Sequence, residues 1–180
     1  DTAVNTAMIA IDKIRDTASS HERVFIVEVM GREHGFLALE IGLVSGAEII
    51  LVPEIEYKLS DVVGQILKGH DRGKSSSIIV MAEGAGDPNK VAEYIKKETN
   101  LDVRVSIIGY IQRGGSPSAF SRMIACKFAE EAVNLLSKGK YGRMVAINSG
   151  RATSYPIEDV LKHKKEINRK LYKLAQILAI

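Results

Sequence analysis

Apolar residues along this chain fall into two alternating patterns, which predict strands and helices in turn. Short, β-branched, nearly continuous runs such as Val24–Val29 are typical of strands that are buried on both faces. Apolar residues at helical spacing, such as Val4, Met8 and Ile11, predict helices between those runs. The runs predict strands at 24–29, 48–52, 77–82, 103–108 and 144–147, and the spacing predicts helices over 4–15, 36–44, 60–68, 118–136 and 166–178, with a further helix from Asp87–Pro88.

This alternation of strands with helices predicts one architecture. Parallel strands need long crossover connections, and helices usually supply them and cover both faces of the sheet. We therefore expect a Rossmann-like three-layer α/β/α fold with a mostly parallel sheet. The length of 180 residues fits one domain, or at most two small ones.

The composition excludes several classes of function. Hydrophobic residues make up 46% of the chain and charged residues 26%, which is ordinary for a globular protein. The net charge is +3, but aromatic residues are only 6% and tryptophan is absent, which does not favour a nucleic-acid partner. No apolar run reaches the roughly 18 residues that a membrane span requires, and the N-terminus lacks the pattern of a signal peptide. We therefore expect no nucleic acid, no membrane and a cytoplasmic location.

The single cysteine, Cys126, excludes an internal disulfide framework and fits a reducing compartment. It lies in a helical-looking apolar stretch at 124–128. We therefore expect a small buried residue rather than a nucleophile.

Polar residues and glycines follow three of the predicted strands at their carboxyl ends, where open parallel sheets bind ligands. Gly31–Arg32 follows the first strand, Glu83–Gly84 the third and Gln112–Gly115 the fourth. Arginine offers a planar fork to phosphate, a carboxylate accepts hydrogen bonds from sugar hydroxyls, and glycines let backbone N–H groups approach a ligand. The combination predicts a site for a phosphorylated polyol, although each segment taken alone also fits a purely structural turn.

Charged residues also occur at the opposite, amino ends of the strands. Arg23 precedes the first strand, and Arg104 lies six residues before Tyr110, or about 20 Å of extended chain. These arginines are either surface charges or parts of a neighbouring subunit's site. A further group of residues lies at helix ends and strand starts. These residues either bind a nucleotide phosphate with its metal ion or form a charged surface in contact with solvent. This amino-edge cluster consists of Arg15, Gly46, Ala47, Glu48, Arg72, Lys74, Ser75 and Ser76.

Common phosphate and metal motifs are absent from the sequence. There is no Gly-x-x-x-x-Gly-Lys-Ser/Thr loop and no Gly-x-Gly-x-x-Gly, and the histidines lack the spacing of metal ligands. His21 and His34 are better explained as loop or cap residues. No Asp-rich loop offers a general base for phosphoryl transfer.

These segments, in this order, resemble the C-terminal half of the bacterial ATP-dependent 6-phosphofructokinases. The resemblance runs over essentially the whole chain and is carried by Arg15–Asp16–Thr17, Ser19–Arg23, Val27–Arg32, Val52–Pro53–Glu54 and Gly109–Pro117. It implies transfer of the γ-phosphoryl group of ATP to the 1-hydroxyl of fructose 6-phosphate, with Mg²⁺, in a homotetramer that acts in glycolysis.

The resemblance also implies roles for individual residues. Arg32 would be catalytic, stabilising charge on the transferring phosphoryl group. Arg23 and Arg104 would bind the substrate of an adjacent subunit. The substrate-binding residues would be Met30, Gly31, Arg32, Glu83, Tyr110, Ile111, Gln112 and Arg113, with Glu83 on the sugar hydroxyls and Tyr110 and Arg113 on the 6-phosphate. The amino-edge cluster would bind ADP–Mg²⁺ as activator or phosphoenolpyruvate as inhibitor, with Glu48 the candidate metal ligand there and no metal ligand in the active site.

The sequence departs from the family in three respects. Tyr110 stands where the best-known bacterial members carry histidine, so its phenol brings no positive charge. Arg72 stands where some members carry lysine, which changes the geometry of the cation. The family's Gly-rich ATP loops, Mg²⁺ aspartate and aspartate base have no counterpart here, and the chain opens directly in a helical pattern. We therefore expect a chain cut inside a larger protein, whose other half holds the main ATP and Mg²⁺ sites, so that these 180 residues alone are inactive.

The resemblance further predicts two parts and leaves two alternatives open. Residues 1–111 and 163–180 would form the substrate- and effector-binding domain, and 112–162 would pack on the missing nucleotide-binding domain, exposing apolar surface in isolation. A pyrophosphate-dependent phosphofructokinase would differ in a donor site outside this sequence, although the amino-edge cluster favours ATP. A non-catalytic sensor of sugar phosphates or nucleotides would bind without turnover.

Overall fold

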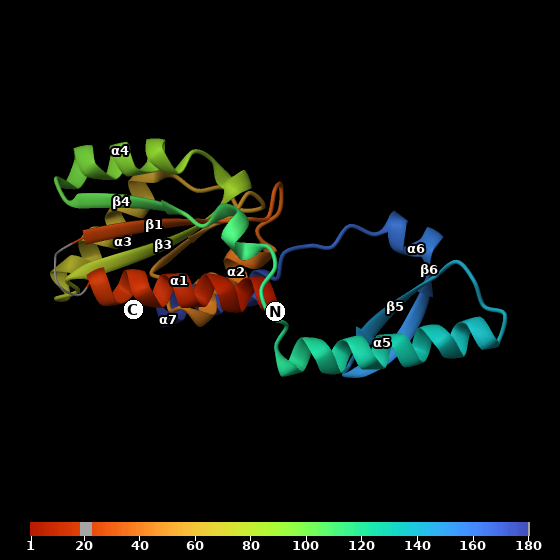
Figure 1. Ribbon diagram of the computed structural model, residues 1–180. Helices are drawn as coiled ribbons and strands as arrows, with labels where there is room; N and C mark the ends of the chain where they lie inside the picture. Colours follow the sequence, from red (N-terminus) through yellow and green to blue (C-terminus); the bar gives the residue numbers. More distant parts are fainter. Residues whose placement is uncertain (19–22, 180) are drawn as a thin grey trace. The chain divides into compact units, whose positions relative to one another are not determined.

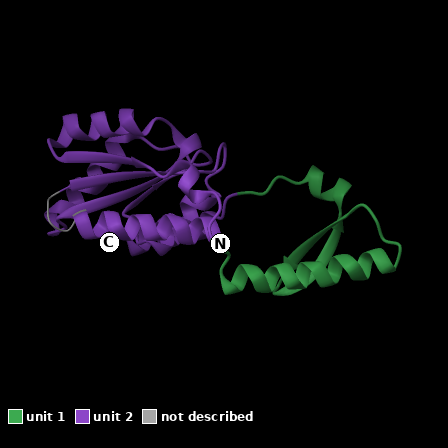
Figure 2. Cartoon of the chain, in the orientation of Figure 1, with its two compact units in different colours: residues 1, 116–166 green, residues 2–115, 167–180 purple. Residues whose placement is uncertain are grey.

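A computed structural model describes residues 1–18 and 23–179 (Figure 1). Residues 19–22 and Ile180 lie outside the described residues, and with them the expectation for His21 and part of one motif. The chain divides into two compact units (Figure 2). The sheet unit contains residues 2–115 and 167–180, and the hairpin unit contains residue 1 and residues 116–166.

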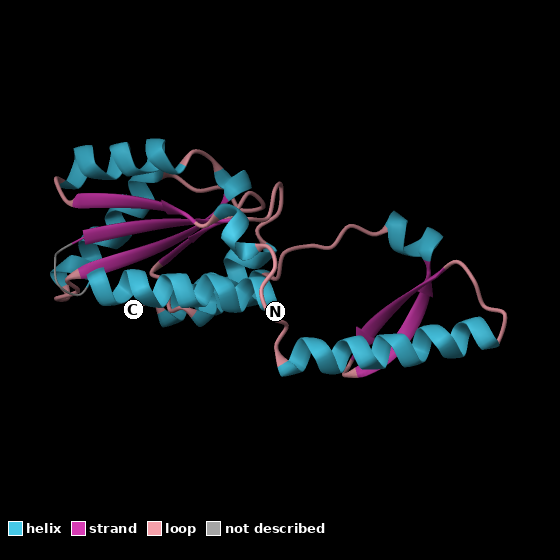
Figure 3. Cartoon of the chain, in the orientation of Figure 1, coloured by secondary structure: helices cyan, strands magenta, loops and turns pink. Residues whose placement is uncertain are grey.

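The sheet unit is built on four parallel strands, β1 (Arg23–Val29), β2 (Ile49–Leu51), β3 (Ser76–Ala82) and β4 (Asp102–Ile107). Their order in the sheet is β2-β3-β1-β4, and every neighbouring pair is parallel. Figure 3 shows the strands in magenta between helices in cyan. Strand β1 pairs with β3 along its whole length, from Arg23 opposite Ser76 to Val29 opposite Ala82. The predicted parallel sheet is confirmed.

Helices cover both faces of this sheet, as the continuous apolar strands predicted. Helices α1 (Thr2–Ala18), α2 (Phe36–Val44) and α7 (Arg169–Leu178) pack on one face, and α3 (Leu59–Asp71) and α4 (Pro88–Thr99) pack on the other (Figure 1). Successive strand residues point to opposite faces. In β3, Ile79 and Met81 therefore enter the core under α3 and α4, while Val80 enters the core under α1 and α2.

Local sequence signals mark both ends of helix α4. The Asp87 carboxylate accepts a hydrogen bond from the Asn89 N–H at 2.9 Å, and Pro88 occupies the first position of α4, where its missing N–H costs nothing. Helix α4 ends at Thr99, and its C-cap residue Asn100 adopts the left-handed conformation with φ of 59°. These caps fix where β4 enters the sheet.

The hairpin unit contains α5 (Ala119–Ser137), β5 (Arg143–Asn148), β6 (Arg151–Pro156) and α6 (Ile157–Lys162). The expectation that the strand at 144–147 belongs to the parallel sheet is wrong, because β5 pairs antiparallel with β6 in a separate two-stranded sheet. Only Ser149 and Gly150 connect them, and a parallel pair needs a much longer crossover. Both residues have positive φ, 50° and 79°, as a tight hairpin turn requires.

Cys126 is exposed on α5, so the expectation of a buried cysteine is also wrong. The stretch around it is helical, as predicted. Among the described residues of α5, however, only Leu135 is buried, because the helix packs against a sheet of only two strands. In the part of the chain that the structure describes, no helix is both long and apolar enough to cross a membrane.

The burial of both faces of the sheet predicts that two isoleucine substitutions will differ strongly in their effect on the free energy of unfolding. Ile79 in β3 is 0% exposed and Ile9 on α1 is 61% exposed. Ile79→Ala should lower the free energy of unfolding by about 2–5 kcal/mol, since it removes contacts and leaves a cavity. Ile9→Ala should change it by only about 0.5 kcal/mol or less. Urea denaturation followed by circular dichroism measures both, and equal losses would contradict this description of the core.

Candidate functional site

The carboxyl ends of three strands bring together the residues that the sequence singled out. Residues 30–32 follow β1, the short 3₁₀ helix η1 (Glu83–Ala85) follows β3, and the 3₁₀ helix η2 (Gly109–Gln112) follows β4. Because the strands are neighbours and parallel, their carboxyl ends meet at one edge of the sheet. We call this group the carboxyl-edge cluster; it consists of Met30, Gly31, Arg32, Glu83, Tyr110, Ile111, Gln112 and Arg113.

A buried amide side chain links the loops after β1 and β4. Gln112 is 3% exposed, and its Oε1 accepts a hydrogen bond from the Met30 N–H at 2.7 Å. Its Nε2 has no hydrogen-bond partner among the described residues. The side chain of Gln112 therefore supports the cluster from inside, while Tyr110 and Ile111, 78% and 71% exposed, lie on its outer surface.

A carboxylate links the loops after β1 and β3 in the same way. Glu83 Oε1 accepts a hydrogen bond from the Arg32 N–H at 2.7 Å. Arg32 has a positive φ of 52°, an uncommon conformation for a residue with a side chain. The loops also approach closely at Gly84, where an added Cβ would lie 2.2 Å from the Arg32 carbonyl oxygen. The backbone of Arg32 is thus fixed from one side by a hydrogen bond and from the other by contact.

Two further contacts shape this edge. The Gly35 N–H, at the start of α2, donates a bifurcated hydrogen bond to the two carboxylate oxygens of Glu54, at 3.0 and 3.1 Å. The Arg113 guanidinium carbon lies 5.0 Å from the centre of the Tyr110 ring, a cation–π distance. The exposed edge therefore presents two cations, Arg32 and Arg113, beside one aromatic ring.

Acidic groups gather behind the cluster. Desolvation raises the pKa of Glu28 in β1, and the negative charges of Glu83 and then Asp87 raise it further. Glu28 lies on the face of β1 that packs toward α3 and α4, two residues after buried Ile26. The Glu83 and Asp87 carboxylates are therefore close enough to Glu28 to disfavour its negative charge.

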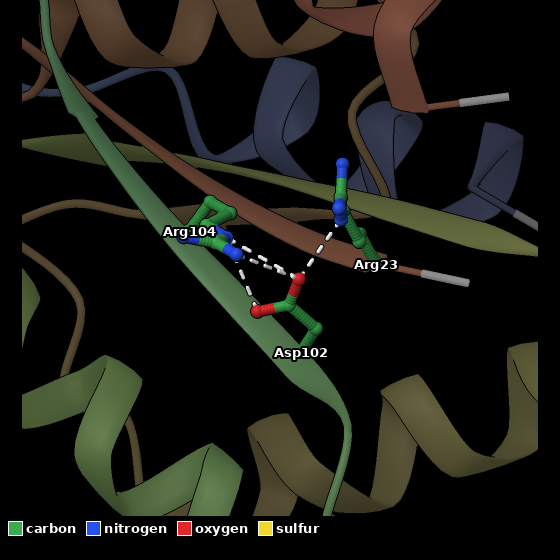
Figure 4. A network of polar contacts seen from close by, with 3 residues as sticks. All are labelled: Arg23, Asp102 and Arg104. Carbon is green, nitrogen blue, oxygen red and sulfur yellow. Dashed lines mark hydrogen bonds and ion pairs between the residues drawn. The ribbon is translucent and has the colours of Figure 1, made fainter. Parts of the chain in front are cut away.

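The two arginines at the amino ends are joined by a carboxylate that the sequence did not single out. Arg23 in β1 and Arg104 in β4 both contact Asp102 (Figure 4). The Arg23 Nε lies 2.8 Å from Asp102 Oδ2, and the Arg104 Nε lies 3.1 Å from Oδ1. Desolvation alone would raise the pKa of Asp102, but hydrogen bonds from Arg23 and then Arg104, together with their charges, lower it.

The amino-edge cluster is only partly brought together. Glu48, Arg72 and Lys74 line one pocket of about 200 Å³. Lys74 Nζ lies 3.4 Å from Glu48 Oε1, and Glu48 Oε2 accepts a hydrogen bond from the Ile78 N–H at 2.7 Å. The other five members do not line this pocket. Arg15 donates to the Ser45 carbonyl, Gly46 and Ala47 form the turn before β2, Ser75 precedes β3, and Ser76 is its first residue.

The same pocket contains residues that sequence reasoning missed. Gln65 and Lys68 lie on one face of α3, three residues apart, and the predicted Arg72 follows at the C-cap of that helix, four residues after Lys68; this spacing was a usable signal. Gln176 comes from the C-terminal helix α7. Gln176 reaches the pocket only because α7 packs on the sheet, and no local pattern in the sequence indicates that packing. Among the described residues, no three His, Cys, Asp or Glu side chains gather as metal ligands.

Comparisons with known proteins identify the family. The sequence profile of the family described as phosphofructokinase matches residues 1–136. The ATP-dependent 6-phosphofructokinases of Bacillus velezensis and Bacillus subtilis are 49% and 47% identical over all 180 residues. The crystal structure of Pichia pastoris phosphofructokinase covers 98% of this chain with a TM-score of 0.82 at 32% identity, and the match takes up 21% of that chain.

The fold is that of an α/β protein with a parallel four-stranded sheet. The chain belongs to the phosphofructokinase family. It spans 56% of the length of the two Bacillus relatives.

The close approach of the loops predicts opposite effects of two glycine substitutions. Gly84→Ala should lower the free energy of unfolding by about 1–3 kcal/mol, because its Cβ meets the Arg32 carbonyl and forces the loop to move. Gly64→Ala, inside α3 with no atom within 4 Å, should raise it by about 0.5–1 kcal/mol. Urea denaturation compares them, and an unshifted Arg32 amide resonance in Gly84→Ala would contradict the proposed contact.

Proposed function

We propose that these residues are part of an ATP-dependent 6-phosphofructokinase. The enzyme transfers the γ-phosphoryl group of ATP to the 1-hydroxyl of fructose 6-phosphate and yields fructose 1,6-bisphosphate, a step of glycolysis. The observation that carries the proposal is that relatives named ATP-dependent 6-phosphofructokinase match the whole of this chain at 47–49% identity. The carboxyl-edge cluster supports it chemically, since one edge of the sheet carries the cations of Arg32 and Arg113 together with the Glu83 carboxylate.

In the proposed reaction the substrate's 1-hydroxyl oxygen bonds to the γ-phosphorus while the bond from that phosphorus to the β–γ bridging oxygen breaks. Such a reaction depends on positioning and on electrostatic stabilisation of the transferring group. Arg32 supplies a cation there, and the Glu83 hydrogen bond holds its backbone. Glu83 Oε2 remains available to sugar hydroxyls, and Arg113 with Tyr110 receives the 6-phosphate. The proton of the hydroxyl passes to a base outside these residues.

We assign the main ATP and Mg²⁺ sites to a part of the enzyme outside this segment. The described residues offer no gathered set of acidic ligands that fits Mg²⁺ at the carboxyl edge. A pyrophosphate-dependent enzyme would differ in that same outlying donor site, and the names of the close relatives favour ATP. A sensor that binds without turnover is the remaining alternative.

We also propose that the enzyme is a homotetramer in which Arg23 and Arg104 bind the substrate of an adjacent subunit. The pocket of Glu48, Arg72 and Lys74 then binds an effector, either ADP–Mg²⁺ or phosphoenolpyruvate. Two cations beside one carboxylate suit a phosphate group, and Glu48 is the candidate ligand for the accompanying ion.

The hairpin unit has the surface expected of a segment that packs on another domain. Helix α5 exposes large apolar side chains that a solvent-facing helix seldom carries in such number. They are Phe120, Met123, Val133 and Leu136, each more than half exposed. We propose that this region, assigned from sequence to 112–162, packs on the nucleotide-binding domain of a cytoplasmic enzyme.

A turnover assay tests the proposed function. A full-length chain containing this segment should form fructose 1,6-bisphosphate from fructose 6-phosphate with ATP and not with pyrophosphate. Aldolase-coupled oxidation of NADH detects the product whichever donor supplies the phosphoryl group. The 180-residue chain alone should give no turnover. Activity of that chain alone, or of the full-length chain with pyrophosphate only, would overturn the proposal.

A pair of arginine variants separates the two candidate sites in the full-length enzyme. Arg113→Ala should raise the half-saturating concentration of fructose 6-phosphate about tenfold to a hundredfold, since a charge-assisted hydrogen bond to phosphate is lost. Arg72→Ala should instead diminish the shift that ADP causes in the substrate saturation curve. Steady-state kinetics with and without ADP measures both effects. If both variants impaired the same response equally, the assignment of separate sites would be wrong.

A further inference from the structure

Asp102 connects the two amino-edge arginines through one end of each guanidinium group. Arg23 on β1 lies directly opposite Asp102 on the neighbouring strand β4. Asp102 Oδ2 accepts from the Arg23 Nε at 2.8 Å and from the Arg104 Nε and Nη2 at 3.2 Å each. The carboxylate thus lies between two cations from adjacent strands (Figure 4).

Within the described residues, this arrangement leaves both terminal nitrogens of Arg23 and one terminal nitrogen of Arg104 available. Among the described residues, no hydrogen bond is formed by Nη1 or Nη2 of Arg23 or by Nη1 of Arg104. The side chains of Arg23 and Arg104 are 25% and 59% exposed, so an anion from solvent can reach them. Terminal guanidinium nitrogens are the donors that bind phosphate oxygens in pairs.

We propose that Asp102 is a positioning residue for a phosphate-binding pair made by Arg23 and Arg104. It holds Arg23 by Nε and Arg104 by Nε and Nη2, and it leaves both terminal nitrogens of Arg23 and the Nη1 of Arg104 for the incoming phosphate. The inference rests on the proposed function, in which that phosphate belongs to the substrate of an adjacent subunit. Asp102 itself does not touch the ligand.

The charge balance supports this role. Two guanidinium groups on neighbouring strands repel each other, and a long exposed arginine side chain loses rotamer freedom when a ligand fixes it. A carboxylate between them offsets the repulsion and orders both side chains before the ligand arrives. The group of three keeps a net charge of +1, so it still attracts phosphate.

The direction in which one substitution changes the affinity for phosphate distinguishes a positioning role from a purely electrostatic one. Removing a negative charge close to a phosphate site strengthens binding if only the charge matters. Removing a positioning group weakens binding, because the ligand must then order both arginines itself. The two readings therefore predict opposite shifts for Asp102→Asn.

The first experiment measures steady-state kinetics in the full-length enzyme. Asp102→Asn should raise the half-saturating fructose 6-phosphate concentration about tenfold with little change in kcat, since only the binding of substrate depends on the ordered pair. Asp102→Glu keeps the carboxylate and should restore part of the affinity. Glu98→Gln is the matched control, because it removes the same charge from the end of α4 without a hydrogen bond to either arginine. Tighter substrate binding in Asp102→Asn would overturn the inference.

The second experiment does not depend on turnover. Full-length protein labelled with ¹⁵N-arginine is titrated with inorganic phosphate, and the Nε–H resonances of Arg23 and Arg104 are assigned by Arg→Lys variants. Phosphate should shift both resonances in the wild type and should need a higher concentration to do so in Asp102→Asn than in Glu98→Gln. Failure of phosphate to shift them, or an equal requirement in the two variants, would overturn the inference. A wild type without turnover but with these shifts would reject the proposed function and retain the role of Asp102.

Discussion

The pairing of β1 with β3 at the centre of a sheet covered on both faces is the constraint on which the rest of the structure depends. The two seven-residue strands pair in full register and supply consecutive buried side chains to two separate cores. A shift of one residue would exchange those cores, so the register is strongly specified. Because all four strands are parallel, this single register also decides which loops meet at each edge.

At the carboxyl edge, that register allows a site to be assembled largely through backbone groups. The Met30 and Arg32 N–H groups donate to side chains that come from the ends of two other strands. Arg32 keeps a positive φ, and such a conformation persists only where its surroundings hold it. The Glu83 carboxylate and the close passage of Gly84 provide that support. The exposed side chain of Arg32 therefore extends from a fixed backbone, as the proposed electrostatic stabilisation of a reacting group requires.

The elements predicted correctly from sequence are those whose signals are local. The apolar run at 24–29 and the Asp87–Pro88 start of α4 need only neighbouring residues to be recognised. The strand β6 was missed because Arg151–Pro156 is polar and short, with no apolar alternation to reveal it. The exposure of Cys126 was missed because periodicity reports which face of a helix is apolar, but not whether anything covers that face. In the same way, Gln176 and Asp102 enter their clusters only through packing and strand pairing, which are tertiary properties.

The length of the strands keeps the arginines at the amino edge of the sheet too far from those at the carboxyl edge for both to bind the same small ligand. A seven-residue strand spans about 20 Å, so Arg23 at one end of β1 and Arg32 beyond the other end cannot both reach one hexose phosphate. Both faces of the sheet are buried under helices, so the motion of a single loop does not close that distance. If the amino-edge arginines act on the same kind of substrate as the carboxyl edge, they must act on a molecule bound to a second protomer. The proposed tetramer then has a physical reason, since the fold divides one set of phosphate contacts between the opposite edges of two sheets.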